Sequence, residues 1–357
     1  MQTRLDYLDG VRGVAILLVL LAHIFPDALT VAGPLGVQIF FVLSGYLITT
    51  LLVAEVERRG GIDLPRFFVR RALRLLPALV VTVVLYVGVV ALLGDPERLR
   101  RAVFGAMTGL VYLTDFALAV HADVPQELGH LWSLAVEEHF YIVWPLLVGL
   151  VLRRWGPQGL RRGLGMAFAA SVPLGLAYAL IPFAHRLDLV DFYFLPSAWV
   201  GSLVAGAFLA VTIPRWRGGR VPQVLSGTPL TWAAVAIAAY LCVEQIWIGP
   251  VLLLLGIPLS GLVATGLLAR VILVPTSVLR GFLEWPALVR LGQISYGVYL
   301  LNRPVILLAE EWFAPSLVVR LLGAAVSVGL AWAMFRWVER PVLALKARWA
   351  PRPAMAL

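Results

Sequence analysis

The sequence predicts an all-α, polytopic integral membrane protein, a helical bundle of about ten transmembrane helices. Three observations of composition and one of pattern predict this class. Hydrophobic residues make up 61% of the 357, charged residues only 14%, and the mean hydropathy is +0.90. Soluble domains carry about 25% charged residues, which excludes an ordinary soluble domain. The chain also repeats apolar runs long enough to cross a hydrocarbon core of about 30 Å.

We interpret the apolar runs of about 17–22 residues, and some shorter ones, as membrane spans. Their predicted bounds are Val11–Phe25, Gly33–Val53, Leu75–Leu93, Leu131–Leu152, Leu164–Phe183, Trp199–Ile213, Leu230–Val243, Val251–Val274, Leu291–Ala309 and Val318–Val338. One further run, Ala102–Val120, is ambiguous. It either crosses the membrane, or enters and returns, or lies at the outer surface.

The basic residues decide between these topologies. If Ala102–Val120 does not span, all the main basic stretches that flank the spans fall on the side of the N-terminus. The positive-inside rule then places both termini in the cytoplasm, in the cell inner (cytoplasmic) membrane. Arg98, Arg100 and Arg101 would face outward, against the rule. The net charge of +9 comes from these clusters, so we expect membrane lipids as partners and no nucleic acid.

The chain shows no repeat period and no low-complexity linker, so we expect one membrane domain, residues 1–345, and a basic cytoplasmic tail, residues 346–357. The single cysteine, Cys242, lies in an apolar segment and excludes an intramolecular disulfide. Asp6, Asp9 and Arg12 crowd the start of the first apolar run, which is atypical of a cleaved signal peptide.

The first span carries an arginine and a histidine. Arg12 and His23 are eleven residues apart, which on a helix is about three turns plus 20° and a rise of about 16 Å. Both therefore project from one face, near opposite ends of the span. Ionisable side chains inside a membrane are costly and commonly mark a functional site.

Two further segments are open to a functional or a structural interpretation. Ser44 follows a glycine-rich stretch, where small residues allow close helix packing. Arg70, Arg71 and Arg74 are expected in a cytoplasmic loop, clustered on one helical surface. Guanidinium groups at this spacing suit phosphates and pyrophosphates, but topological charge and anionic lipids explain them too.

The densest polar cluster surrounds the start of the fourth span. His130 and Glu137 are seven residues apart with Ser133 between them, so all three are predicted to share a helix face. A carboxylate beside a histidine fixes its tautomer and raises its basicity. Metal binding and simple local hydrogen bonding are alternatives. Glu138 and His139 are expected to point away from this face.

The ninth predicted span has a polar edge. Ser295, Tyr296, Tyr299 and Asn302 recur at helical spacing along it. Small hydroxyl groups in membrane helices often serve packing, so this edge alone does not establish a site.

Five blocks together resemble the membrane-bound acyltransferase 3 family. They are the Asp-Gly-x-Arg-Gly…His start, the Phe-Phe-Val-Leu-Ser-Gly-Tyr run, the Arg-x-x-Arg-Leu-x-Pro segment, the His-x-Trp-Ser-Leu-Ala-Val-Glu-Glu helix and the Ile-Ser-Tyr-Gly-x-Tyr-Leu segment. The resemblance covers nearly the whole chain. It implies transfer of an acyl group, often acetyl from acetyl-CoA or another acyl-CoA, to a hydroxyl of a glycan or a small molecule such as a macrolide, with no metal expected.

The resemblance also implies roles for individual residues. His23 matches the family's essential histidine, Arg12 its partner, and Glu137 lies on the conserved polar face with Ser133. Arg71 and Arg74, with Arg70 beside them, match the motif associated with the acyl donor. Substrate contacts are expected from Asp9, Ser44, His130, Trp132, Ser133, Tyr296 and Asn302.

The sequence departs from the family pattern at three places. His139 stands where glutamine is usual, and Asn302 where many members have histidine. Ala198-Trp199 replaces an arginine often found there. These departures affect the expected acceptor contacts, whereas His23, Arg71 and Arg74 are unaffected.

The hypothesis from the sequence is O-acyl transfer with His23 as general base, oriented or charge-stabilised by Glu137. A transporter or flippase of a lipid-linked or small-molecule substrate is the alternative, since it would also need many spans and intramembrane charges. It predicts internal repeats with matching broken helices, and none is found. A non-catalytic membrane scaffold would leave His23, His130 and Glu137 without a purpose.

Overall fold

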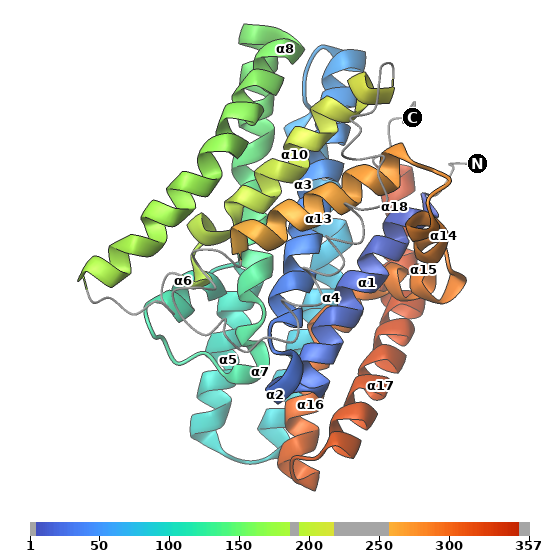
Figure 1. Ribbon diagram of the computed structural model, residues 1–357. Helices are drawn as coiled ribbons and strands as arrows, with labels where there is room; N and C mark the ends of the chain where they lie inside the picture. Colours follow the sequence, from blue (N-terminus) through green and yellow to red (C-terminus); the bar gives the residue numbers. More distant parts are fainter. Residues whose placement is uncertain (1–4, 186–192, 218–256, 350–357) are drawn as a thin grey trace. The chain divides into compact units, whose positions relative to one another are not determined.

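The computed structural model describes residues 5–185, 193–217 and 257–349. All regular structure in these ranges is helical (Figure 1), which confirms the predicted all-α class. Six of the described helices are long and apolar enough to cross a membrane. The predicted span Leu230–Val243 and the beginning of Val251–Val274 lie outside the described residues. The total of about ten spans therefore stays a prediction.

The helices fall into two compact units, each made of two separate stretches of chain. Unit 1 consists of Met1–Ile62 and Phe140–Gln293, and unit 2 of Asp63–His139 and Ile294–Leu357. The helices of unit 1 are α1 (Asp6–Ile24), α2 (Pro26–Leu29), α3 (Ala32–Arg59), α10 (Pro196–Arg217), α13 (Ile257–Leu273), α14 (Val278–Leu283) and α15 (Pro286–Gln293). Those of unit 2 are α4 (Leu64–Leu92), α5 (Pro96–Leu110), α6 (Thr114–Ala119), α7 (Gln126–Gly129), α16 (Ser295–Phe313), α17 (Leu317–Met334), the π-helix η3 (Phe335–Glu339) and α18 (Arg340–Trp349).

Helix α8 (Trp132–His185) begins in unit 2 and continues in unit 1. It contains a break at Gly156, whose φ is 64° and ψ −171°. Only glycine adopts such a backbone conformation readily. The break separates two helices that correspond to the predicted spans Leu131–Leu152 and Leu164–Phe183.

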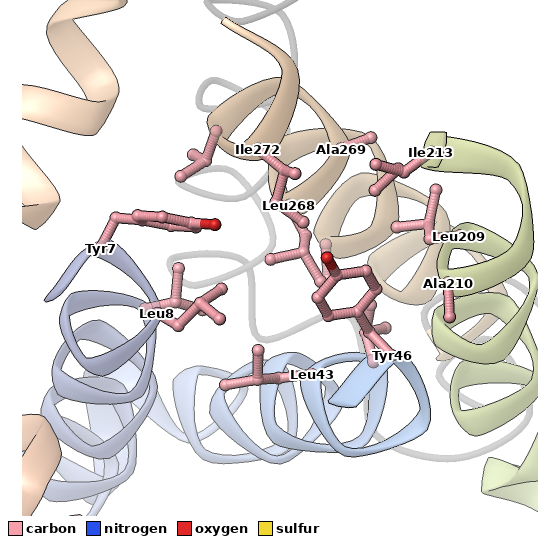
Figure 2. Close-up of a cluster of buried hydrophobic side chains, with 14 of the residues drawn as sticks. Tyr7, Leu8, Leu43, Tyr46, Leu209, Ala210, Ile213, Leu268, Ala269 and Ile272 are labelled. Carbon is pink, nitrogen blue, oxygen red and sulfur yellow. The ribbon is translucent and has the colours of Figure 1, made fainter. Parts of the chain in front are cut away.

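The core of unit 1 is an apolar cluster contributed chiefly by α1, α3, α10 and α13. Figure 2 shows these side chains converging, with Tyr7 of α1 and Tyr46 of α3 among them. Arg280 of α14 lies over the ring of Tyr7, 4.2 Å from its centroid. This cation–π contact ties the start of α1 to α14 at the edge of the cluster.

Helices α3 and α10 cross with their backbones in close contact. A Cβ at Gly45 would lie 1.9 Å from the carbonyl oxygen of Leu203, and one at Gly206 would lie 1.9 Å from that of Val42. Both helices therefore require glycine at the crossing, since no side-chain movement can relieve a clash with a backbone oxygen. The crossing fixes the position of Ser44, the neighbour of Gly45.

Substitution Gly45→Ala is expected to destabilise the folded protein by about 1–3 kcal/mol or more, because the added methyl group forces the two backbones apart. The measurement is the thermal unfolding midpoint of the detergent-solubilised protein. Gly88→Ala is the matched control, since a Cβ at this exposed position of α4 meets nothing within 4 Å. Equal midpoints for the two variants would contradict the assigned crossing.

Helix α1 makes a similar close contact with α14 and α15. A Cβ at Gly10 would lie 1.8 Å from the carbonyl oxygen of Leu283, and one at Gly13 would lie 2.3 Å from that of Leu288. These are the two glycines of the Asp-Gly-x-Arg-Gly motif. They let α1 approach its neighbours closely, which fixes how Asp9 and Arg12 are presented.

Helix α4 of unit 2 begins well before its apolar run. Asp63 caps its N-terminus by accepting a hydrogen bond from the amide of Arg66, and Pro65 stands in the first turn. The helix then continues to Leu92. Arg70, Arg71 and Arg74 lie in its first three turns, which confirms that they share a helix, but the helix begins eleven residues before the predicted Leu75 and leaves no separate loop there.

The ambiguous run Ala102–Val120 is not one helix. Helix α5 ends at Leu110, Tyr112 has a left-handed φ of 56°, and α6 begins at Thr114. Arg98 at the start of α5 binds Glu127 of α7 at 3.1 Å, so the chain leaves one end of unit 2 and returns to it (Figure 1). The run is therefore not a single spanning helix, and its placement as a re-entrant segment or at the outer surface stays a prediction.

Arg98 stands at the centre of an ion-pair network at this end of unit 2. Besides Glu127 it binds both carboxylate oxygens of Glu311 of α16, and the Nη2 that donates to Glu127 also donates to Glu311 Oε2 at 2.6 Å. The hydrogen bond from Arg98 lowers the pKa of the Glu311 carboxyl, because it stabilises the ionised form. The network connects α5, α7 and α16.

The two neighbouring arginines are paired as well. Arg100 lies 2.6 Å from Glu97 and 3.5 Å from Asp123, and Arg101 lies 3.9 Å from Asp123. The positive charge of this end is thereby neutralised by nearby carboxylates. The arginines that contradict the positive-inside rule in the sequence are thus not an unbalanced basic cluster.

Candidate active site

The first group of predicted site residues lies on α1 in unit 1. Asp9 is buried and its Oδ1 accepts a hydrogen bond from Arg12 at 2.9 Å. Because α1 is continuous from Asp6 to Ile24, His23 stands about 16 Å along the axis from Arg12 and on the same face, as expected from their spacing. His23 is half-buried and lies in the last turn of the helix.

The second group lies in unit 2, where α4 faces the start of α8. Arg71 Nε donates to Glu138 Oε1 at 2.6 Å, and an Arg71 Nη lies 4.0 Å from Glu137. The three side chains are each at most 18% exposed. A guanidinium between two carboxylates in a partly buried setting forms strong charge-assisted hydrogen bonds. Arg71 is thus held by α8.

The two other predicted donor-binding arginines differ from Arg71 in exposure. Arg74 is exposed and Arg70 is half-buried. Arg74 also experiences the charge of Glu339, a buried carboxylate at the end of η3. Short π-helical segments such as η3 occur frequently at functional sites.

The third group gathers around Tyr299 of α16. The Tyr299 hydroxyl donates to the carbonyl of His130 at 2.8 Å and makes a very short contact with the Ser133 hydroxyl. The His130 and Tyr299 rings are 5.3 Å apart. His130 precedes α8, and Ser133, three residues later, donates to its carbonyl through the backbone nitrogen at 3.4 Å and through Oγ at 3.5 Å. Tyr299 adds a contact to each of the two residues. Trp132, at the first position of α8, is buried beside them.

The other residues predicted to contact the substrate are Tyr296, Asn302 and Ser44, and the first two form hydrogen bonds within the protein. The Tyr296 hydroxyl donates to the carbonyl of Leu75 in α4 at 2.9 Å. Asn302 is fully buried, and its amide nitrogen donates to the carbonyls of Val298 and Tyr299, both at 2.8 Å. Ser44 is half-buried on α3 in unit 1.

The structure therefore assembles two separate sets of predicted residues. Asp9, Arg12, His23 and Ser44 belong to unit 1, and the arginines of α4 belong to unit 2 together with His130, Ser133, Glu137 and Tyr296. The expected action of Glu137 on the His23 imidazole stays a prediction. Among the described residues, no group of three or more histidine, cysteine, aspartate or glutamate side chains could hold a metal ion.

Three contributors to the site were not anticipated. Glu138 and His139 were expected to point away, yet Glu138 makes the closest contact with Arg71, and His139 lies 3.2 Å from the buried Asp115. Tyr299 was noted only as part of a polar edge. The sequence offered a signal for Tyr299, since it lies one turn after Ser295 on the same edge.

Comparison with known families decides the assignment. Residues 5–336 match the family described as acyltransferase domain. The chain belongs to this family. The match includes the Asp9–Arg12 pair, His23, the α4 arginines and the start of α8, so every motif that carries the resemblance lies inside it.

The curated relatives of this chain are bacterial proteins named as O-acetyltransferases. The chain is 28% identical to the peptidoglycan O-acetyltransferase OatA of Listeria monocytogenes, over 94% of its own length and 55% of the relative. It is 27% identical to the O-acetyltransferase OatA of Staphylococcus aureus, over 94% and 56%. The chain thus spans about half the length of these relatives. No solved structure matches it.

Proposed function

We propose that the chain is a membrane-bound O-acyltransferase. It moves an acyl group, for which we propose acetyl, from cytoplasmic acyl-CoA to a hydroxyl of a glycan or small molecule. The observation that carries this proposal is the family match over residues 5–336. The names of the relatives favour peptidoglycan as the acceptor. A membrane setting agrees with the six long apolar helices.

His23 is the proposed general base. It takes the proton of the acceptor hydroxyl while that oxygen attacks the thioester carbonyl, so a C–O bond forms and the C–S bond breaks. The thiolate leaves and takes the proton from the imidazolium. General-base catalysis of this kind contributes about 10²–10⁴-fold. Direct transfer and a relay through an acyl-enzyme both fit this assignment.

Arg12 is proposed to guide the donor's pantetheine arm or to stabilise the thioester oxygen. The Asp9 carboxylate at 2.9 Å supports this role, because it fixes the guanidinium in one orientation. The close approach of Gly10 and Gly13 to α14 and α15 holds this turn of α1 in place.

The arginines of α4 are proposed to bind the donor phosphates at the cytoplasmic face. The three arginines differ in exposure, and we propose different roles for them on that basis. Arg74 is exposed and Arg70 is half-buried, whereas Arg71 is held by Glu138 at 2.6 Å. We therefore assign direct phosphate contact to Arg74 and Arg70, and to Arg71 the alignment of α4 with α8.

The test is donor binding by detergent-solubilised protein. Arg74→Glu is expected to weaken the binding of fluorescent acetyl-CoA by at least about tenfold, because a favourable charge–phosphate contact becomes repulsive. Arg66→Glu is the matched control, an exposed arginine two turns earlier on α4. No binding by the unmodified protein would favour the transporter alternative. Equal binding by both variants would contradict the phosphate role of Arg74.

Transfer itself is measured in membranes supplied with labelled acetyl-CoA and peptidoglycan fragments. Mass spectrometry of wall glycans and secreted small molecules, from cells with and without the protein, then identifies the acceptor. Label on a small molecule and none on glycan would overturn the peptidoglycan assignment and leave the acyltransferase assignment in place.

A further inference from the structure

The turn between α5 and α6 has an unusual backbone. Leu113 N donates to the carbonyl of Thr108 at 2.8 Å, and Tyr112 N donates to that of Gly109 at 3.2 Å. These are the two hydrogen bonds of a Schellman motif, whose left-handed position is normally glycine. Here the position is Tyr112, with a φ of 56°. A residue with a Cβ keeps this conformation only where its surroundings enforce it.

One side chain of α8 packs directly beside this turn. His139 Nδ1 lies 3.2 Å from the carboxylate of Asp115, and its ring lies 5.2 Å from that of Phe116. His139 thus contacts the first turn of α6, directly after the left-handed turn.

Asp115 explains why a donor is required at this place. Its side chain is fully buried, as is the neighbouring Thr114. A buried carboxylate is strongly destabilising unless a donor or a cation faces it. In the described part of the chain, His139 is the ion-pair partner of Asp115. A carboxylate is an acceptor, so the imidazole of His139 can stabilise Asp115 only as a donor or as a cation.

The neighbour of His139 in sequence is Glu138, which binds Arg71 at 2.6 Å. We propose that His139 is a positioning residue for acyl transfer, which pins the Tyr112–Asp115 turn to α8 and so keeps Glu138 aligned with Arg71. This inference rests on the proposed function for its kinetic consequence only. The pinning itself is a property of unit 2 and can be measured without any activity.

The direct test is hydrogen–deuterium exchange of the purified full chain. In His139→Ala, amides of residues 108–122 are expected to exchange at least about tenfold faster, because the turn opens locally. In His139→Gln they are expected to stay within about twofold of the unmodified protein, since the side-chain amide offers two N–H donors without charge. Peptides of α17 serve as the internal reference, and His121→Asn is the histidine control.

Kinetic measurements distinguish a positioning role of His139 from a merely structural one. His139→Ala is expected to raise the KM for acetyl-CoA by about tenfold while the KM for the acceptor stays unchanged, and His139→Gln should restore it. Unchanged exchange in His139→Ala, or a His139→Gln variant that exchanges as fast as His139→Ala, would overturn the pinning. Faster exchange with unchanged donor KM would overturn the positioning role. Absence of transfer by the unmodified protein would instead count against the proposed function.

Discussion

Replacing His23 with alanine is expected to reduce acyl transfer by about 10²–10⁴-fold, the usual contribution of a positioned general base. The physical reason is the loss of the group that removes the acceptor's proton as the C–O bond forms. The measurement is the initial rate of label transfer from acetyl-CoA in membranes that contain equal amounts of each variant. Stability should change little, because His23 is half-buried in the last turn of α1.

His121→Asn is the matched control for the His23 experiment. His121 is an exposed histidine in unit 2, and asparagine tolerates its left-handed φ of 54°. This variant should transfer label at the rate of the unmodified protein. A His23→Ala variant that transfers at a near-normal rate would contradict the general-base assignment. His23→Gln should be as inactive as His23→Ala, because an amide cannot accept the proton.

Removing Arg71 is expected to destabilise the protein by about 3 kcal/mol, because the Glu138 carboxylate then stays partly buried without its cation. Removing Glu138 should cost less, because Glu137 lies 4.0 Å from Arg71. The double variant Arg71→Leu with Glu138→Leu should lose less than the sum of the single variants. The measurement is a double-mutant cycle of unfolding midpoints in detergent. The same proteins are then assayed for transfer, and a stable but inactive double variant would show that Arg71 also serves the reaction.

The exposed pair Arg100–Glu97 provides the comparison cycle. Its atoms are also 2.6 Å apart, but its side chains are 61% and 62% exposed. Exposed ion pairs contribute about 0–1 kcal/mol, so this cycle should show little coupling. Equal coupling energies in the two cycles would contradict the prediction that burial strengthens the Arg71–Glu138 ion pair.

Composition and apolar run length were enough to predict the helical membrane class, but not the helix boundaries. The first turns of α4 contain several arginines, so a search for apolar runs places the helix start too late. The start signals were nevertheless present, since Asp63 is a favourable N-cap and Pro65 suits the first turn. For α5 and α6 the apolar run gave no sign of the turn, because Tyr112 occupies a position where glycine would have marked it.

The site was predictable only where its residues share one helix. Arg12 and His23 lie on one helix, and their spacing alone places them on one face. Glu138 could not be linked to Arg71 in this way, because they are 67 residues apart and meet only when α4 packs against α8. The link between Ser133 and Tyr299 spans 166 residues and depends equally on tertiary packing.

The broken α5–α6 segment has a consequence for how the protein is made. Neither helix is long enough to be integrated into the bilayer by itself, and a turn exposed to lipid would leave backbone groups unsatisfied. Its partner His139 is synthesised later, and Glu311, which binds Arg98 at its entry, later still. The contacts that hold this segment can therefore form only after the residues that follow it in the chain, up to Glu311, have been synthesised.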